Sequence, residues 1–223
     1  MSRRLAPLLL AILVLAGCGE ERGGDGKAQL WITRDRGAQV LLEREVPAGL
    51  TAMQALDRVA DVETRYGGRF VQAIDGIEGS LTKQRDWFWF VNGIEGDRGA
   101  TEYRLRPGDV EWWDFRSWSG ARMAQPVVVG AFPEPFVHGY DGEVRPAVVV
   151  GSGPAARAIA RLIRGRVGDD ERGANVIEIV PGMPVFRGTR ADDGSFRFVI
   201  GRRDAQRLAT NPKLARFRYE GLP

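Results

Sequence analysis

The alternation of hydrophobic and polar positions is clearest between residues 86 and 115. Two aromatic runs, residues 87–93 and 103–115, consist of residue types that favour strands. An Asn-Gly pair ends the first strand-like run, Pro-Gly-Asp precedes the strand-like part of the second, and both are typical of turns. Four of the six Trp residues and three of the ten Phe lie here, and each buried ring removes roughly 150 to 250 Å² from water. The pattern predicts two strands of one sheet.

Shorter patterns before this region predict the rest of a first domain. Residues 29–33 and 39–43 read as strands joined by a turn, and residues 70–74 as another strand that ends at an Asp-Gly pair. Between them, Thr51 and Gln54 have the spacing of a capping box that starts a helix over residues 51–60. The order predicts an α+β fold with a mixed, β-grasp-like sheet and one helix on one face.

The composition changes after Trp118, and a second small α/β domain is expected over residues 125–223. Val-rich segments at 127–129 and 147–150 predict buried strands, and a helix is expected at 154–163. Three further strands (176–180, 184–187, 195–200) and a short helix (204–209) complete it. Residues 151–156 match a dinucleotide-binding Gly pattern, but the Pro within the loop and the position of Glu178 inside the next strand favour a plain turn before a helix.

The first 18 residues indicate export from the cytoplasm. Arg3 and Arg4 precede an apolar run too short to span a bilayer, which is typical of a signal peptide over residues 1–17. The run ends in Leu-Ala-Gly-Cys, which resembles a bacterial lipobox, and Cys18 is the single cysteine of the chain. We therefore expect Cys18 to carry a lipid, with residues 18–27 as a flexible tether and residues 28–120 as the first domain.

Several motifs in the same order resemble the C-terminal β-grasp domain of the transcobalamin and intrinsic factor family over residues 28–118. They are the helix at 51–60, the Ile-Asp-Gly and Val-Asn-Gly strand ends at 74–76 and 91–93, and the Tyr-Arg-Leu and Gly-Asp-Val segments that precede Trp112. In the vitamin B12 carriers this domain closes over cobalamin held mainly by a helical domain. The resemblance implies a corrinoid or similar flat ligand. Since no helical region of that kind is visible here, it also implies a partner protein that supplies the helical half of the site.

The candidate ligand-binding residues are taken from the aromatic strands: Trp87, Trp89, Asn92, Gly93 and Trp112. Strand side chains alternate, so Trp87 and Trp89 share one face while Phe88 and Phe90 share the other. Either both faces are core and interdomain packing, or one face is an exposed aromatic binding surface. Trp112 and Trp113 point to opposite faces, so at most one of them belongs to such a surface.

Catalytic and metal chemistry has little support. Without a free thiol, nucleophile elbow, phosphate loop or ligand cluster, we expect no enzyme, no catalytic residue, no metal site and no cofactor beyond a bound corrinoid. His138 is the single histidine, and its loop position favours a solvated side chain. Removal of Arg3 and Arg4 leaves a net charge of about +1, so nucleic acid is not an expected partner.

Together these features predict a lipid-anchored binding module on the extracytoplasmic face of a bacterial cell membrane. It would capture cobalamin or another large planar ligand for uptake, together with a transporter or helical partner protein. The alternative is an envelope lipoprotein for protein–protein interaction with no small ligand, in which the aromatic strands pack against the C-terminal domain.

Overall fold

The fold combines two five-stranded sheets, a small three-stranded sheet and three α-helices within the described part of the chain. The computed structural model describes residues 26–119, 126–169, 172–182 and 184–223. Elements of its first half are β1 (Lys27–Arg34), β2 (Gln39–Pro47), α1 (Ala52–Asp57), β3 (Val62–Arg65), β4 (Phe70–Ile74), β5 (Ile77–Glu78), β6 (Arg85–Val91), β7 (Ile94–Glu95) and β8 (Val110–Ser117). The second half contains β9 (Ala147–Val150), α2 (Gly153–Leu162), β10 (Arg166–Val167), β11 (Asn175–Val180), β12 (Phe186–Arg190), β13 (Phe196–Gly201), α3 (Arg202–Thr210) and the 3-10 helix η2 (Pro212–Ala215). The predicted α+β class is confirmed.

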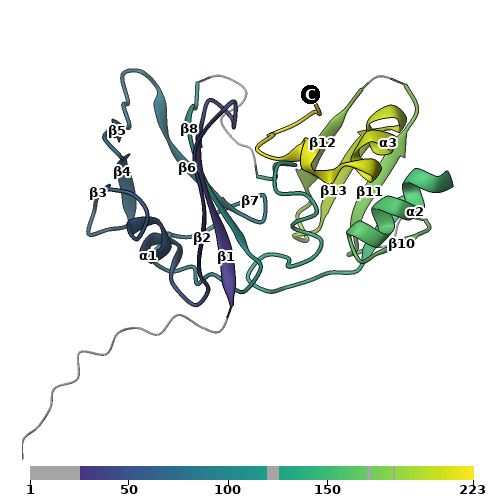
Figure 1. Cartoon of the computed structure of the whole chain (residues 1–223), viewed down its shortest axis with the longest axis horizontal. Coiled ribbons are helices and arrows are strands. Elements are labelled where there is room, and N and C mark those ends of the chain that lie inside the picture. The colour runs from purple at the N-terminus through teal and green to yellow at the C-terminus, as the bar shows by residue number, and fades with distance from the viewer. Residues whose placement is uncertain (1–25, 120–125, 170–171, 183) are drawn as a thin grey trace, which may run out of the picture.

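The first sheet has the strand order β2-β1-β8-β6-β7 and is mixed, because β1 and β8 run parallel while the other pairs are antiparallel. The predicted aromatic strands β6 and β8 pair directly, with Trp89 opposite Trp113. Figure 1 shows β1 and β2 beside them in the same layer. The central position of β8 explains why nearly all of its side chains are buried.

One face of this sheet is covered by α1 and the small sheet β3-β4-β5. The capping box is present, since the Thr51 side chain accepts from the Gln54 backbone N–H and the Gln54 side chain accepts from Thr51 N–H. The helix is shorter than the predicted span of 51–60, because Arg58 caps it and the chain turns into β3. Its buried Ala55 and Leu56 pack on the aromatic strands.

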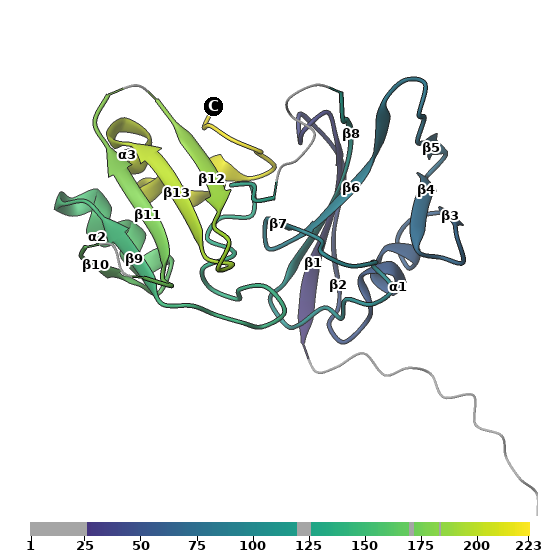
Figure 2. The ribbon, with the colours of Figure 1, turned by 180° about the vertical axis from the view of Figure 1, so that it is seen from behind.

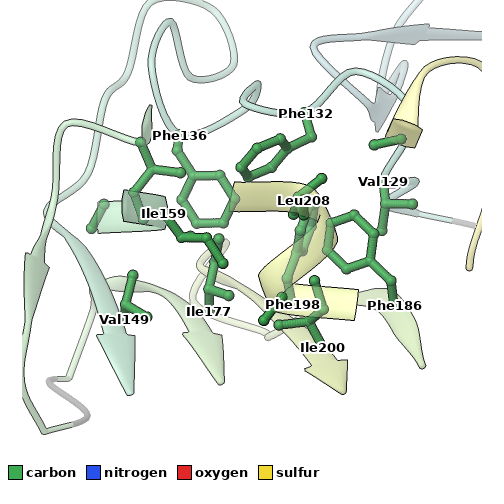
Figure 3. Packing of buried hydrophobic residues seen from close by; sticks show 14 of the residues in the cluster. Val129, Phe132, Phe136, Val149, Ile159, Ile177, Phe186, Phe198, Ile200 and Leu208 are labelled. Carbon is green, nitrogen blue, oxygen red and sulfur yellow. The ribbon is translucent and has the colours of Figure 1, made fainter. Parts of the chain in front are cut away.

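The second sheet has the order β10-β9-β11-β13-β12 and is parallel except for the edge strand β12. Helices α2 and α3 pack against each other and share one core with this sheet. Figure 3 shows Ile159 of α2 and Leu208 of α3 with Ile177 and Phe198 of the strands. The chain bends at Gly151, Ser152 is the extended N-cap residue, and α2 begins at Gly153.

The segment between the sheets differs from its prediction. Residues 127–129 form no strand, because only Val127 makes a single bridge, to Ile94 of β7. Val128 N–H donates to Gly93 O at 2.7 Å, and Val129 N–H donates to Tyr219 O at 3.2 Å. Backbone hydrogen bonds of the valine run therefore go to separate partners instead of one neighbouring strand.

The C-terminal segment returns to the first sheet, as Figures 1 and 2 show from opposite sides. Tyr219 is buried with Phe90 and Trp112 in a cluster between the two sheets, and its hydroxyl donates to Asp114 Oδ2 at 3.0 Å. Asp114 Oδ1 also accepts from Thr33 Oγ1 at 2.5 Å. A buried carboxylate with several donors thus holds the tail in place.

His138 lies beside Gly108 and is half-buried rather than solvated. Its Nδ1 is 2.9 Å from Glu134 Oε1, and its backbone N–H donates to Glu134 Oε2. A Cβ at Gly108 would lie 2.6 Å from the His138 ring, so glycine permits the close approach. Burial raises the pKa of Glu134, and the neighbouring His138 partly offsets this rise.

The predicted signal peptide and Cys18 lie outside the described residues. Within the ranges that the structure covers, no helix combines the length and apolar character required to cross a membrane.

Candidate ligand-binding groove

The aromatic residues predicted to bind a ligand are divided between the two faces of the first sheet. On the face toward α1, Trp89 stacks with Trp113 at 5.9 Å between ring centroids, and Trp87 packs against Phe115 at 5.2 Å. Trp87 is buried, whereas Trp89 is half-buried. This face is therefore mainly core.

The opposite face is closed by the C-terminal half of the chain. Trp112 is fully buried, 5.7 Å from Phe90 and 5.4 Å from Tyr219 between ring centroids. Its Nε1 donates to Thr33 Oγ1 at 2.8 Å. The structure therefore places Trp112 on the other side of the sheet from Trp87 and Trp89, and packs both aromatic faces.

Asn92 and Gly93 form the turn after β6 and join the two halves. The buried Asn92 side chain donates to Asp109 Oδ1 at 2.8 Å and to Gly139 O at 2.7 Å, and accepts from Val110 N–H at 2.8 Å. Gly93 has a φ of +81°, and a Cβ there would lie 2.6 Å from Val128 O. Asn92 and Gly93 therefore have a structural role where the two halves of the chain meet. A direct ligand contact by any of the five residues stays a prediction.

A groove of about 480 Å³ lies instead beside the small sheet. Its exposed apolar side chains are Tyr66 and Leu81, about 80% exposed each, and Phe70, 37% exposed. Tyr66 and Phe70 meet edge to face, with ring centroids 6.3 Å apart. Large apolar side chains gathered at one exposed hollow are typical of a binding surface.

The polar side of the groove is formed by Asp86, Gln72, Glu78 and Arg65. The Asp86 carboxylate accepts from the Trp87 backbone N–H at 2.9 Å, and burial raises its pKa while that bond and Arg65 lower it. Gln72 Nε2 donates to Glu78 Oε1 at 2.9 Å. Carboxylate and amide oxygens can thus orient a ligand that carries hydrogen-bond donors.

Residues 78–80 form one wall of the groove, where the backbone of Gly79 lies close to the Asp86 side chain. A Cβ at Gly79 would lie 2.5 Å from Asp86 Oδ1, so a larger residue would displace that carboxylate. Beneath this wall, Trp87 Nε1 donates to Ile77 O at 2.8 Å. The sequence-predicted Trp87 is therefore linked to the groove as the support of its wall.

A second hollow of about 550 Å³ lies on the other side of this wall. It is basic, being lined by Arg34, Lys83 and Arg85, and it shares residues 78–80 with the apolar groove. The Arg85 guanidinium lies 4.8 Å from the Phe115 ring centroid. An apolar groove and a basic hollow thus adjoin along one short segment.

Sequence reasoning did not select Tyr66, Phe70 or Leu81. A usable signal was present, because Tyr66 and Phe70 flank a Gly-Gly pair and Leu81 stands in a polar run. Among the residues that the structure describes, no group of three or more His, Cys, Asp or Glu could hold a metal ion. The geometry offers recognition of an apolar ligand.

The residues that line the groove lie within a segment that is similar to a known family model. Residues 49–117 match the model of a domain of unknown function, DUF4430. This match covers less than a third of the chain. No curated protein matches. Similar solved structures include a Ruminococcus gnavus protein whose name proposes metal binding (16% identity, TM-score 0.35, 42% of this chain and 98% of that one). Haptocorrin in complex with Cbi is another (15% identity, TM-score 0.34, 40% of this chain and 24% of that one).

Proposed function

We propose that this chain is a binding module that holds an apolar face of a large, flat ligand in the groove of Tyr66, Phe70 and Leu81. The observation that carries the proposal is the joint exposure of these three side chains at one hollow. Its volume of about 480 Å³ lies within the roughly 300 to 1,000 Å³ typical of ligand sites. Two aromatic rings and one Leu would cover one side of the ligand.

Corrinoids are the ligand class to test first. The sequence motifs shared with the vitamin B12 carriers motivate this choice, and Asp86, Glu78 and Gln72 would accept from or donate to polar groups at the ligand edge. A groove on the surface leaves the far side of such a ligand uncovered. A transporter or helical partner protein would complete the site during uptake.

The lipid on Cys18 would keep this module at the extracytoplasmic face of the cell membrane. The first described strand begins at Lys27, so only the short tether separates the first sheet from the anchor. Replacement of Cys18 by Ala should release the protein into the soluble fraction and abolish labelling with a radioactive fatty acid. A Cys18→Ala protein that stays labelled and membrane-bound would contradict the anchor.

Binding can be tested by titrating the chain from residue 19 onward with cobalamin and with cobinamide while recording Trp fluorescence. Because Trp87 lies beneath the groove wall, saturable quenching is expected after correction for ligand absorbance. Tyr66→Ala combined with Phe70→Ala should weaken binding about tenfold or more, since stacking and apolar contact are lost. Thermal unfolding should show that the variant remains folded.

Leu41→Ala is the matched control, because Leu41 is an exposed apolar residue of β2 outside the groove. Equal weakening by Leu41→Ala would contradict the assignment of the site. Absence of saturable quenching in the unaltered chain would overturn corrinoid binding by this chain alone. It would favour the envelope interaction protein, which is supported by the packing of Phe90 and Trp112 against the C-terminal segment.

A further inference from the structure

A separate pocket of about 310 Å³ lies on the second sheet, far along the chain from the apolar groove. It is formed where β11 and β13 begin and β12 ends, and its lining includes Arg172, Arg190, Arg197, Thr189, Asp193 and Ser195. Three arginines thus share one hollow with a single acidic residue. The lining carries an excess of positive charge.

The arginines differ in how far they are already neutralised. Arg197 Nη1 pairs with Glu178 Oε2 at 2.9 Å. Arg172 and Arg190 form no ion pair within the described ranges, and both are exposed. Arginine donates from a planar fork that matches the oxygen pairs of carboxylates and phosphates. Two guanidinium groups are therefore available to a ligand.

The one acid in the pocket is engaged within its own turn. Asp193 Oδ1 accepts from the Ser195 backbone N–H at 2.9 Å and from Ser195 Oγ at 2.5 Å. These bonds lower the pKa of Asp193, so it remains charged, but they direct Oδ1 toward Ser195. Asp193 and Ser195 thereby fix the shape of this turn.

Arg145 ties the two walls of the pocket together from behind. Its Nη2 donates to Asp193 O at 2.6 Å and its Nη1 to Gly173 O at 3.4 Å. Gly173 and Asp193 both line the pocket, on the loop before β11 and the turn before β13. The spacing of the arginine-bearing walls is therefore held by a side chain that bridges two backbone carbonyls.

We propose that this pocket binds a small oxyanion with two or more phosphate or carboxylate groups, held by Arg172 and Arg190. The excess positive charge attracts a multiply charged ligand, and the pocket volume suits a small molecule rather than a polymer. This second site is separate from the apolar groove. The module would then bind one ligand through apolar contacts and another through its negative charge.

Calorimetric titration of the chain from residue 19 onward with pyrophosphate and with citrate, at constant ionic strength, tests the proposal. Saturable binding with one site per chain is expected for at least one of them. Pyrophosphate alone would identify phosphate groups as the ligand chemistry, and citrate alone would identify carboxylates. Arg190→Ala should weaken binding about tenfold or more, because a charge-assisted pair of hydrogen bonds is lost. Arg190→Lys keeps the charge without the fork and should weaken it less.

Arg187→Ala is the control, since Arg187 is an exposed arginine of the same strand outside the pocket. Its binding should match that of the unaltered chain. No saturable binding of either anion, unchanged binding in Arg190→Ala, or equal weakening in Arg187→Ala would overturn the site. The Tyr66→Ala, Phe70→Ala variant should retain anion binding, so failure of the apolar groove and failure of this pocket are distinguishable.

Discussion

Glu111 is a carboxyl group fully enclosed in the core beside Trp113. Its Oε1 accepts from Trp113 Nε1 at 2.6 Å, while Oε2 has no hydrogen-bond partner in the described part of the chain. Burial raises the pKa of Glu111 well above its usual value, and the Trp113 bond only partly offsets this. The folded state therefore favours the protonated acid.

The raised pKa of Glu111 makes the free energy of unfolding depend on pH. Because the folded state holds this proton more tightly than the unfolded state, stability falls as pH rises above the ordinary glutamate pKa toward the raised one. Glu111→Gln keeps the acceptor for Trp113 and cannot ionise. At pH 7 it should be more stable than the unaltered chain by on the order of 1 kcal/mol, and the difference should disappear near pH 4.

Urea unfolding between pH 4 and pH 7 measures this difference. Glu63→Gln, an exposed residue of β3, should leave the free energy of unfolding nearly unchanged over the same range. A Glu111→Gln protein that is less stable than the unaltered chain at pH 7 would show that the ionised form is favoured in the fold.

At the scale of elements, α1 depends on its N-terminal cap. The helix has six residues, which is too short to be stable by itself, so its position rests on packing and on the Thr51–Gln54 capping box. Gln54 N–H donates to Thr51 Oγ1 at 3.2 Å, and Thr51 N–H donates to Gln54 Oε1 at 2.8 Å. The cap therefore fixes the element that covers the Trp87 and Trp89 face.

Thr51→Ala should lower the free energy of unfolding by about 1 kcal/mol, because one helix N–H loses its acceptor. Thr51→Ser retains the hydroxyl and should lose much less. Denaturant unfolding of the two variants, compared at one pH, measures the contrast. Equal destabilisation by Ala and Ser would assign the effect to the lost methyl group of Thr51 instead of the cap.

For the whole molecule, the C-terminal segment joins the two halves through Tyr219. The ring packs on Phe90 and Trp112, and the hydroxyl donates to the buried Asp114. Arg216 also pairs with Glu43 of β2 on the same side. Contacts between residues more than a hundred positions apart thus close the sheet face.

Tyr219→Phe should destabilise the full chain by about 1 to 3 kcal/mol, because a buried carboxylate loses one donor while the ring packing is kept. Thermal and urea unfolding provide the measurement. Tyr66→Phe removes a hydroxyl from an exposed ring and should change stability by less than about 0.5 kcal/mol. Equal effects of the two changes would mean that the Asp114 contact contributes little.

The local sequence pattern was sufficient to predict most strands and helices. The alternation at 70–74 and around Trp89 predicted β4 and β6, and the Thr51 to Gln54 spacing predicted the start of α1, because these signals depend on neighbouring residues. The valine run at 127–129 shows the limit. Its side chains have strand propensity, but the partners Ile94, Gly93 and Tyr219 lie elsewhere in the sequence and prevent regular pairing.

The amino-acid sequence alone thus determined the α+β class, the aromatic strand pair and the alternation of its faces. Only the tertiary structure decided which part of the chain covers each face of the aromatic strands. The burial of Trp112, for example, depends on Tyr219, which is distant in the sequence. The apolar groove was decided in the same way, since Tyr66, Phe70 and Leu81 form one surface only after β3, β4 and the segment before β6 are folded together. Periodicity is a property of adjacent residues, whereas a site is a property of residues that the fold brings together.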